Sequence, residues 1–184
     1  SEQSLFIMKI WVIEISDFLP IIDGDNRLYR VGMLAKALTE HGHQVLWWTS
    51  TFNHQARHQR FETSKTVSIQ KNYKIRLLFG PGYKRSVSFA RLNHNRTIAK
   101  EFLREANIMV RQEKPDIIYT CMPTLEVSEQ AIQLGVENKI PVIVDIRELW
   151  PDNYLLYFPT LLRPIVKIFL KKEFTRIHRI MSRA

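Results

Sequence analysis

Short apolar runs alternate with stretches of helical periodicity along most of this chain, and this alternation restricts the fold more than any other feature. The apolar runs are LFIMKIWVIEI (5–15), VLWWTS (45–50), IIYTC (117–121) and the run that begins at Pro141. Helical spacing of apolar residues extends over about 26–40, 97–113, 124–138 and 160–183. Short buried strands that alternate with helices predict an α/β fold of the Rossmann-like type, with a doubly wound parallel sheet.

The region between the second and third of these strands predicts a smaller β unit and a loop. TVSIQ (66–70) and KIRLLF (74–79) flank Lys71-Asn72-Tyr73, which favours a hairpin. GPGYKRSVSFARLNHNR (80–96) is typical of a basic loop that leads into the helix at about Thr97. Gly42 is expected to end the first helix in the left-handed conformation, and Thr124 to cap the third.

A length of 184 residues suits one domain with a full hydrophobic core. Met8 stands where a natural start would lie, so residues 1–7 are expected to be either an added leader or an extension of the first strand. Residues 8–184 then form the domain. No apolar run approaches the roughly 20 residues that span a bilayer, and the single cysteine, Cys121, fits a reducing cytoplasm.

Three loops should form the ligand crevice, because ligands of such sheets bind beyond the carboxyl ends of the strands. They are residues 16–27, 121–126 and 145–154. The first loop holds Gly24 alone, without the G-x-G-x-x-G of a dinucleotide-binding protein, and the chain has neither a Walker loop nor a G-x-S-x-G elbow. Asp23, Asp25 and Asn26 are either turn and cap residues, or they accompany Arg27, which from the first helical turn would reach an anion.

Charged side chains follow the last apolar run in PVIVDIRELWPDNY, where Asp145, Arg147 and Glu148 precede Trp150. In an extended chain Asp145 and Arg147 point to one side and Glu148 to the other. A purely structural interpretation is an ion-paired strand end, with Trp150 packed over the core. The functional interpretation is a wall of the ligand crevice.

The net charge of +9 indicates an anionic partner, and its excess is concentrated in one stretch. The basic residues of that stretch are Lys84, Arg85, Arg91, Arg96, Lys100 and Arg104. They form either a solvated face or a surface for lipid phosphates. His54 and His58 would share a helical face, but no third ligand lies nearby, so no metal site is predicted.

The sequence resembles the N-terminal half of a family 4 retaining glycosyltransferase of the GT-B fold, and most closely the bacterial members that build O-antigen, capsule and related surface polysaccharides. The resemblance is carried by DNR-x3-VGMLA, by GH-x-V-x-WWTSTF-x-H and by DIRELWP, from about Met8 onward. In that family two Rossmann-like domains face each other across a cleft, and the C-terminal one binds the nucleotide-sugar donor through an E-x7-E pair. The chain stops before that domain, so the resemblance implies a fragment that is inactive alone.

The resemblance also implies the roles of individual residues. Glu148 and Asp145 are the catalytic candidates; the acceptor-binding candidates are Gly24, Asp25, Asn26, Arg27, His54, Arg91, Cys121 and Arg147. No cofactor is implied, since the nucleotide sugar is the donor substrate. The acceptor would be a lipid-linked glycan or an oligosaccharide, and the protein would lie in the cytoplasm or on the inner face of the cytoplasmic membrane.

A different class of function stays open. A non-enzymatic α/β module could bind an anionic membrane surface or nucleic acid through the basic face, although no nucleic-acid-reading motif is present and no nucleic-acid partner is expected.

Overall fold

A computed structural model of the chain describes residues 6–24, 27–86, 88–122, 124–148, 155 and 158–182, with the side chain of Phe169 left out. The predictions for Asp25, Asn26, Trp150 and Pro151 fall outside these residues.

The central element is a six-stranded sheet with the order β5-β6-β2-β1-β7-β8. Its strands are β1 (Lys9–Ile13), β2 (Gln44–Ser50), β5 (Lys65–Gln70), β6 (Tyr73–Leu78), β7 (Ile117–Met122) and β8 (Val142–Ile146). All neighbouring pairs are parallel except β5 with β6, which form the predicted hairpin. A separate short ribbon pairs β3 (Phe52–Asn53) with β4 (His58–Gln59). The prediction of a Rossmann-like α/β fold is confirmed.

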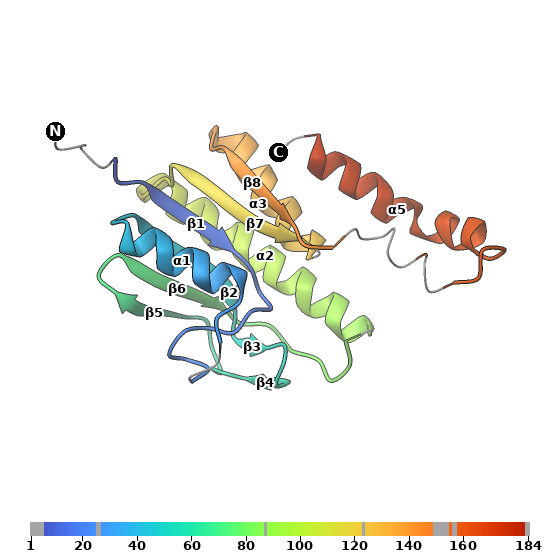
Figure 1. Cartoon of the computed structure of the whole chain (residues 1–184), viewed down its shortest axis with the longest axis horizontal. Coiled ribbons are helices and arrows are strands. Elements are labelled where there is room, and N and C mark those ends of the chain that lie inside the picture. Colours follow the sequence, from blue (N-terminus) through green and yellow to red (C-terminus); the bar gives the residue numbers. More distant parts are fainter. Residues whose placement is uncertain are drawn as a thin grey trace.

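Helices cover both faces of this sheet. They are α1 (Arg30–Glu40), α2 (Phe89–Gln112), α3 (Leu125–Asn138) and α5 (Arg163–Met181). Figure 1 shows α1 across one face, α2 and α3 behind the other, and α5 to the side, beyond β8. The central strand β2 contributes side chains to two cores: Trp47 packs with Val31 and Ala35 of α1, whereas Trp48 packs with Phe102 of α2.

The first strand and the first helix differ from their predicted bounds for local reasons. The strand spans Lys9–Ile13 rather than 5–15, because the Glu14 carboxylate accepts the backbone N–H groups of Ser16 and Asp17 and so turns the chain. The helix begins at Arg30 rather than near Asn26, because Tyr29 is extended, with its ring 5.4 Å from that of Phe18. Arg27 therefore precedes the helix instead of lying in its first turn.

The prediction of a loop up to residue 96 was wrong, since α2 begins at Phe89. Ser88 explains this start, because its Oγ accepts the backbone N–H of Arg91 and so caps the helix. Of the two predictions for helix ends, the one for Gly42 is confirmed and the one for Thr124 is confirmed only in its position. Gly42 has a φ of +84° after α1, and Thr124 precedes α3 but makes no side-chain capping bond.

The last helix packs only at its C-terminal part. Ile180 is buried with Met122, Leu125 and Ile132, and Arg176 pairs with Glu126 and Glu129 of α3. Further toward its start Ile165 and Ile168 are exposed, so the apolar stripe is only partly buried, and the helix spans Arg163–Met181 rather than 160–183. In the described part of the chain, no helix has the length and apolarity needed to cross a membrane.

Candidate functional site at the carboxyl edge of the sheet

The carboxyl ends of the five parallel strands lie at one edge of the sheet, and the connections reverse direction between β1 and β7. After β1 the chain continues to β2 on one side, and β7 lies on the other. Ligand crevices of open α/β sheets form at such a reversal. Four of the predicted site residues lie there: Cys121 on β7, Asp145 on β8, and Arg147 and Glu148 just after β8.

Arg147 is the centre of an ion-paired group at this edge. Its Nη1 and Nη2 donate to the two carboxylate oxygens of Asp17 at 3.0 and 3.3 Å, and its Nε donates to Asp145 Oδ2 at 3.4 Å. Nη1 also lies 4.0 Å from Glu14 Oε1. Asp17 is almost fully buried, so its charge depends on this fork of N–H donors.

Asp145 accepts donors from two further elements, α1 and β7. Arg30 Nη1 of α1 lies 2.7 Å from its Oδ1, and the Cys121 thiol of β7 lies 3.9 Å from its Oδ2. Burial opposes ionisation of this carboxyl, but the Tyr119 hydroxyl and the charges of Arg30 and Arg147 outweigh it and hold the pKa of Asp145 below its ordinary value. Asp145 is therefore an ionised, well-paired carboxylate that orients its neighbours.

Glu14 is a carboxyl group of this cluster with a raised pKa. Burial, followed by the charge of Asp17, raises the pKa of Glu14 to about 7 against the opposing effects of backbone N–H groups and Arg147. Near neutral pH this group is therefore divided between its two protonation states. This edge therefore contains Glu14, which exchanges a proton near neutral pH. The carboxyl groups of Asp17 and Asp145 beside it are paired with guanidinium groups.

Glu14→Gln should remove a pH-dependent loss of stability. Because the folded-state pKa of Glu14 exceeds its ordinary value of 4.5, folding favours the protonated form, and this contribution is lost as pH rises toward and past about 7. The variant keeps a neutral side chain, so its stability relative to wild type should increase by about 2–3 kcal/mol between about pH 5 and pH 8. Urea unfolding of both proteins at the two pH values measures this difference. A difference that does not change with pH would show that Glu14 is ionised throughout.

A buried ion pair fixes the first loop against the end of β2. Asp23 accepts two bonds from Arg60, at 2.7 and 2.6 Å, and one from the backbone N–H of Leu19. Arg60 also donates to the backbone oxygens of Ser50 and Phe52. Asp23 is therefore a turn residue, as one of the two sequence interpretations held, and Gly24 follows it with a φ of +75°.

A second group at the same edge is cationic and aromatic. The ring of Tyr83 packs on those of Phe52 and His94, and the Tyr83 hydroxyl contacts His54 Nδ1. Two guanidinium carbons lie over this ring, that of Arg57 at 5.2 Å and that of Arg91 at 5.9 Å from its centroid.

His94 joins three elements beneath this group. The backbone N–H of Gly82 donates to its Nδ1 at 3.1 Å, and its Nε2 lies 3.2 Å from Ser50 Oγ. Burial and the charge of Arg91 lower the pKa of His94 to about 4, so it is neutral at physiological pH. We therefore infer that His94 supports the structure of this edge and does not contact a ligand.

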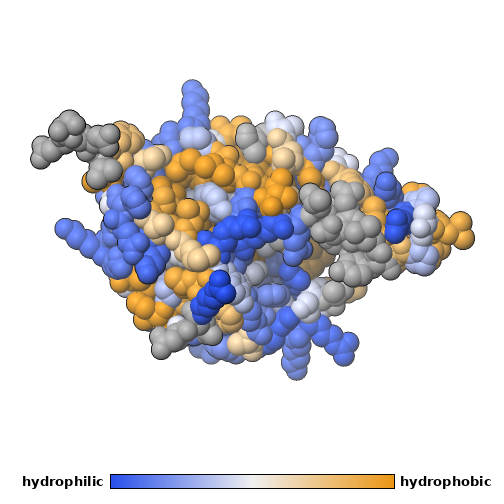
Figure 2. All heavy atoms as spheres, viewed as in Figure 1, coloured by the Kyte–Doolittle hydropathy of each residue, from blue (hydrophilic) through white to orange (hydrophobic). Residues whose placement is uncertain are grey.

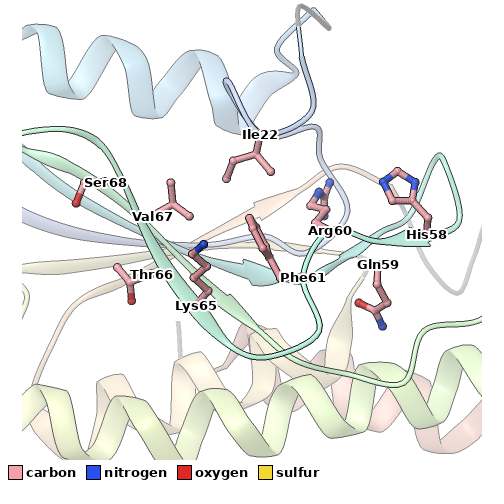
Figure 3. A pocket seen from close by; sticks show the side chains of 9 residues that line it. All are labelled: Ile22, His58, Gln59, Arg60, Phe61, Lys65, Thr66, Val67 and Ser68. Atoms are coloured by element: carbon pink, nitrogen blue, oxygen red, sulfur yellow. The ribbon is translucent and has the colours of Figure 1, made fainter.

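One described cavity lies beside this edge rather than on the Arg147 group. It has a volume of about 590 Å³ and is drawn in Figure 3, where Ile22, Phe61 and Val67 form its apolar wall. Its polar residues include His58, Arg60 and Lys65, but Arg60 is paired with Asp23 and no carboxylate lines the space. We see no acid–base pair in this cavity.

The other predicted residues differ in their burial and in their surroundings. Glu148 is exposed at the end of β8 and makes no ion pair with the described residues, and Arg27 is exposed ahead of α1. Cys121 is 5% exposed beneath Asp145, and burial raises the pKa of its thiol. His54 lies in a turn and His58 in β4, so the prediction that they share a helical face was wrong. The described residues contain no group of three or more His, Cys, Asp and Glu side chains arranged to hold a metal ion.

Several residues of this edge were missed by the sequence analysis. They are Glu14, Asp17, Arg30, Arg57, Tyr83 and Tyr119. Glu14 and Asp17 carry the signal that identified Asp145 and Glu148, since they too follow a buried strand directly. The others come from helices, turns and a strand interior, where no local pattern marks them.

Comparison with known proteins gives similarity to solved structures alone. No protein-family model matches the chain, and the search of curated proteins finds no match either. A solved structure described as the glycotransferase of kitacinnamycin is similar, with a TM-score of 0.48 and 15% sequence identity. The similarity covers 95% of this chain and 39% of that one, so this chain spans well under half of the solved chain.

Proposed function

We propose that this chain is the acceptor-side domain of a glycosyltransferase, which transfers a sugar from a nucleotide sugar to a hydroxyl group of a lipid-linked or oligosaccharide acceptor. The observation that carries the proposal is the group at the carboxyl edge: Arg147 held between Asp17 and Asp145, with the exposed Glu148 next in the chain. Of the motifs that resemble family 4 enzymes, DNR-x3-VGMLA contains Arg30 and DIRELWP contains Asp145 and Arg147, and these three side chains pair at this edge.

Sugar transfer requires a positioned acceptor hydroxyl and stabilisation of the leaving diphosphate. Glu148 is free to accept a hydrogen bond from an acceptor hydroxyl, whereas Asp145 is already occupied by Arg30 and Arg147. We therefore assign the direct contact to Glu148 and a positioning role to Asp145. Arg147 supplies positive charge beside the hydroxyl, and Arg27 extends this charge along the first loop.

The donor site would belong to a second domain. This chain has no glycine-rich phosphate loop, so a nucleotide sugar would be bound from the opposite side of a cleft, in a GT-B arrangement with a retaining mechanism. We propose surface-polysaccharide synthesis as the context and the inner face of the cytoplasmic membrane as the location. The nucleotide sugar is the donor substrate, and no further cofactor enters the proposal.

The coding sequence beyond residue 184 provides a simple test. We expect it to continue into a second α/β domain that contains E-x7-E. A reading frame that ends near residue 184, together with salt-dependent binding of oligonucleotides by the chain, would instead support the non-enzymatic anion-binding module. Both observations can be made without knowing the sugar or the acceptor.

A further inference from the structure

We propose that Arg57, Arg91 and His54 bind the phosphate group of a phosphate ester, either a soluble metabolite or a lipid headgroup. The inference goes beyond the proposed function, because it requires neither a nucleotide sugar nor a second domain. It applies to the cationic group around Tyr83, not to the ion-paired group around Arg147.

The first argument is the unbalanced positive charge. Arg57 and Arg91 both lie over the Tyr83 ring, and both hydrogen-bond to Ser86, one to its hydroxyl and the other to its backbone oxygen. Neither guanidinium forms an ion pair with an acid in the described part of the chain, whereas Arg60, Arg76 and Arg147 all do. Two guanidinium groups held together without an acid repel each other until an anion joins them.

The second argument is an unpaired buried donor. Arg57 Nη1 is buried and has no hydrogen-bond partner, although Nη2 of the same guanidinium contacts Ser86. An unpaired buried N–H group is costly, and native structures rarely retain one without a reason. Arg57 also has a φ of 57°, a conformation that favours glycine over a long side chain. The chain therefore holds this arginine in place at a conformational cost.

The third argument concerns His54 and the adjacent helix. Burial, and then the charges of Arg91 and Arg57, lower the pKa of His54 to about 4, so its imidazole is neutral at physiological pH. If the Tyr83 hydroxyl donates to Nδ1, the proton of the neutral ring lies on Nε2 and is available to an acceptor. Arg91 lies in the first turn of the 24-residue helix α2, whose N-terminus adds positive potential at the same point.

A phosphate group matches this set better than a carboxylate. Two guanidinium groups offer paired N–H donors, and a phosphate presents three acceptor oxygens and up to two charges. Exposed Lys84 and Arg85 precede the group and increase the attraction for a dianion.

The experiment is a titration of the chain with inorganic phosphate, followed through the imidazole NMR signals of His54. Arg57→Gly removes the guanidinium and suits the positive φ, so this variant should fold at least as well as wild type. Arg91→Gln keeps the backbone N–H that Ser88 caps. Arg96→Gln is the matched control, because it removes an exposed charge from the same helix without touching Tyr83.

We expect phosphate to bind wild type and Arg96→Gln equally and to raise the pKa of His54, because the anion offsets the neighbouring arginines. Binding should weaken roughly tenfold or more in Arg57→Gly and in Arg91→Gln. Equal weakening in all three variants would overturn the proposal, since it would show a diffuse charge effect. Absence of phosphate binding by folded wild type would overturn it too, and would leave the transferase proposal untouched.

Vesicles identify the source of the phosphate. Phosphatidylcholine vesicles that contain phosphatidic acid present a phosphomonoester headgroup, and vesicles with phosphatidylserine present a phosphodiester. Selective binding to phosphatidic acid that is lost in Arg57→Gly assigns the site to a lipid headgroup. Phosphate binding in solution without that selectivity assigns it to a soluble ester.

Discussion

Replacing Arg147 by leucine should lower the free energy of unfolding by about 3–5 kcal/mol at neutral pH. The side chain is the counterion of Asp17, whose carboxylate is 4% exposed, and it lies beside Glu14 and Asp145 as well. Without it, buried carboxylates face one another, and among the described residues the exposed Arg30 is the cation that still pairs with Asp145. Urea unfolding of wild type and variant at neutral pH measures the loss.

Two comparisons separate the loss of charge from the loss of packing. The destabilisation should shrink at acidic pH, where the carboxyl groups take up protons. The double variant with Asp17→Asn should be more stable than Arg147→Leu alone, because the stranded carboxylate is then neutral. If the variant is equally destabilised at pH 5 and pH 8, the account of this ion-paired group is incorrect.

The second large effect is expected on turnover. On the proposed function, Glu148→Gln in the full-length protein should lower the rate of sugar transfer about a hundredfold, because the acceptor hydroxyl would lose the group that orients it. Its melting temperature should stay unchanged, since Glu148 is exposed and unpaired among the described residues. Transfer rates and melting curves of the two proteins provide the measurement.

Glu137→Gln is the matched control for this prediction. Glu137 is an exposed glutamate near the end of α3, and α3 begins at the carboxyl edge and runs back to the opposite one. This variant should transfer sugar at the wild-type rate. Normal turnover by Glu148→Gln with a normal melting curve would remove Glu148 from the mechanism.

The sheet could be predicted from the sequence because its strands are nearly all apolar and its hairpin has a clear turn. Asp145 and Arg147 could be predicted because they stand at the end of an apolar strand, where a charged side chain lies at the crevice rather than in the core. The same rule, applied to Glu14 and Asp17, would have found the acidic half of the edge.

Other parts of the site depend on contacts between distant residues. Arg57 and Arg91 are far apart in sequence, and they meet only because the connection from β6 to α2 passes over the β3–β4 ribbon. Arg30 reaches Asp145 because α1 covers the neighbouring strands. The start of α2 was missed because a single hydroxyl, that of Ser88, decides it against a basic sequence that resembles a loop.

Apolar surface remains beside the site. Figure 2 shows apolar side chains over the β7 and β8 side of the face that carries α1, next to a group of strongly hydrophilic side chains. Ile143 and Ile146 of β8 are 49% and 40% exposed. An acceptor with both a charged and an apolar part would find both kinds of surface close to the carboxyl edge.

The most direct test of the central claim, that an acceptor site lies at this edge, is the transfer of labelled sugar by the full-length protein. A panel of radiolabelled nucleotide sugars is incubated with the protein and a membrane extract, and label is measured in the lipid and oligosaccharide fractions. The account predicts transfer from at least one nucleotide sugar by wild type and about a hundredfold less by Glu148→Gln. Absence of transfer from every donor by a protein that unfolds normally would contradict it.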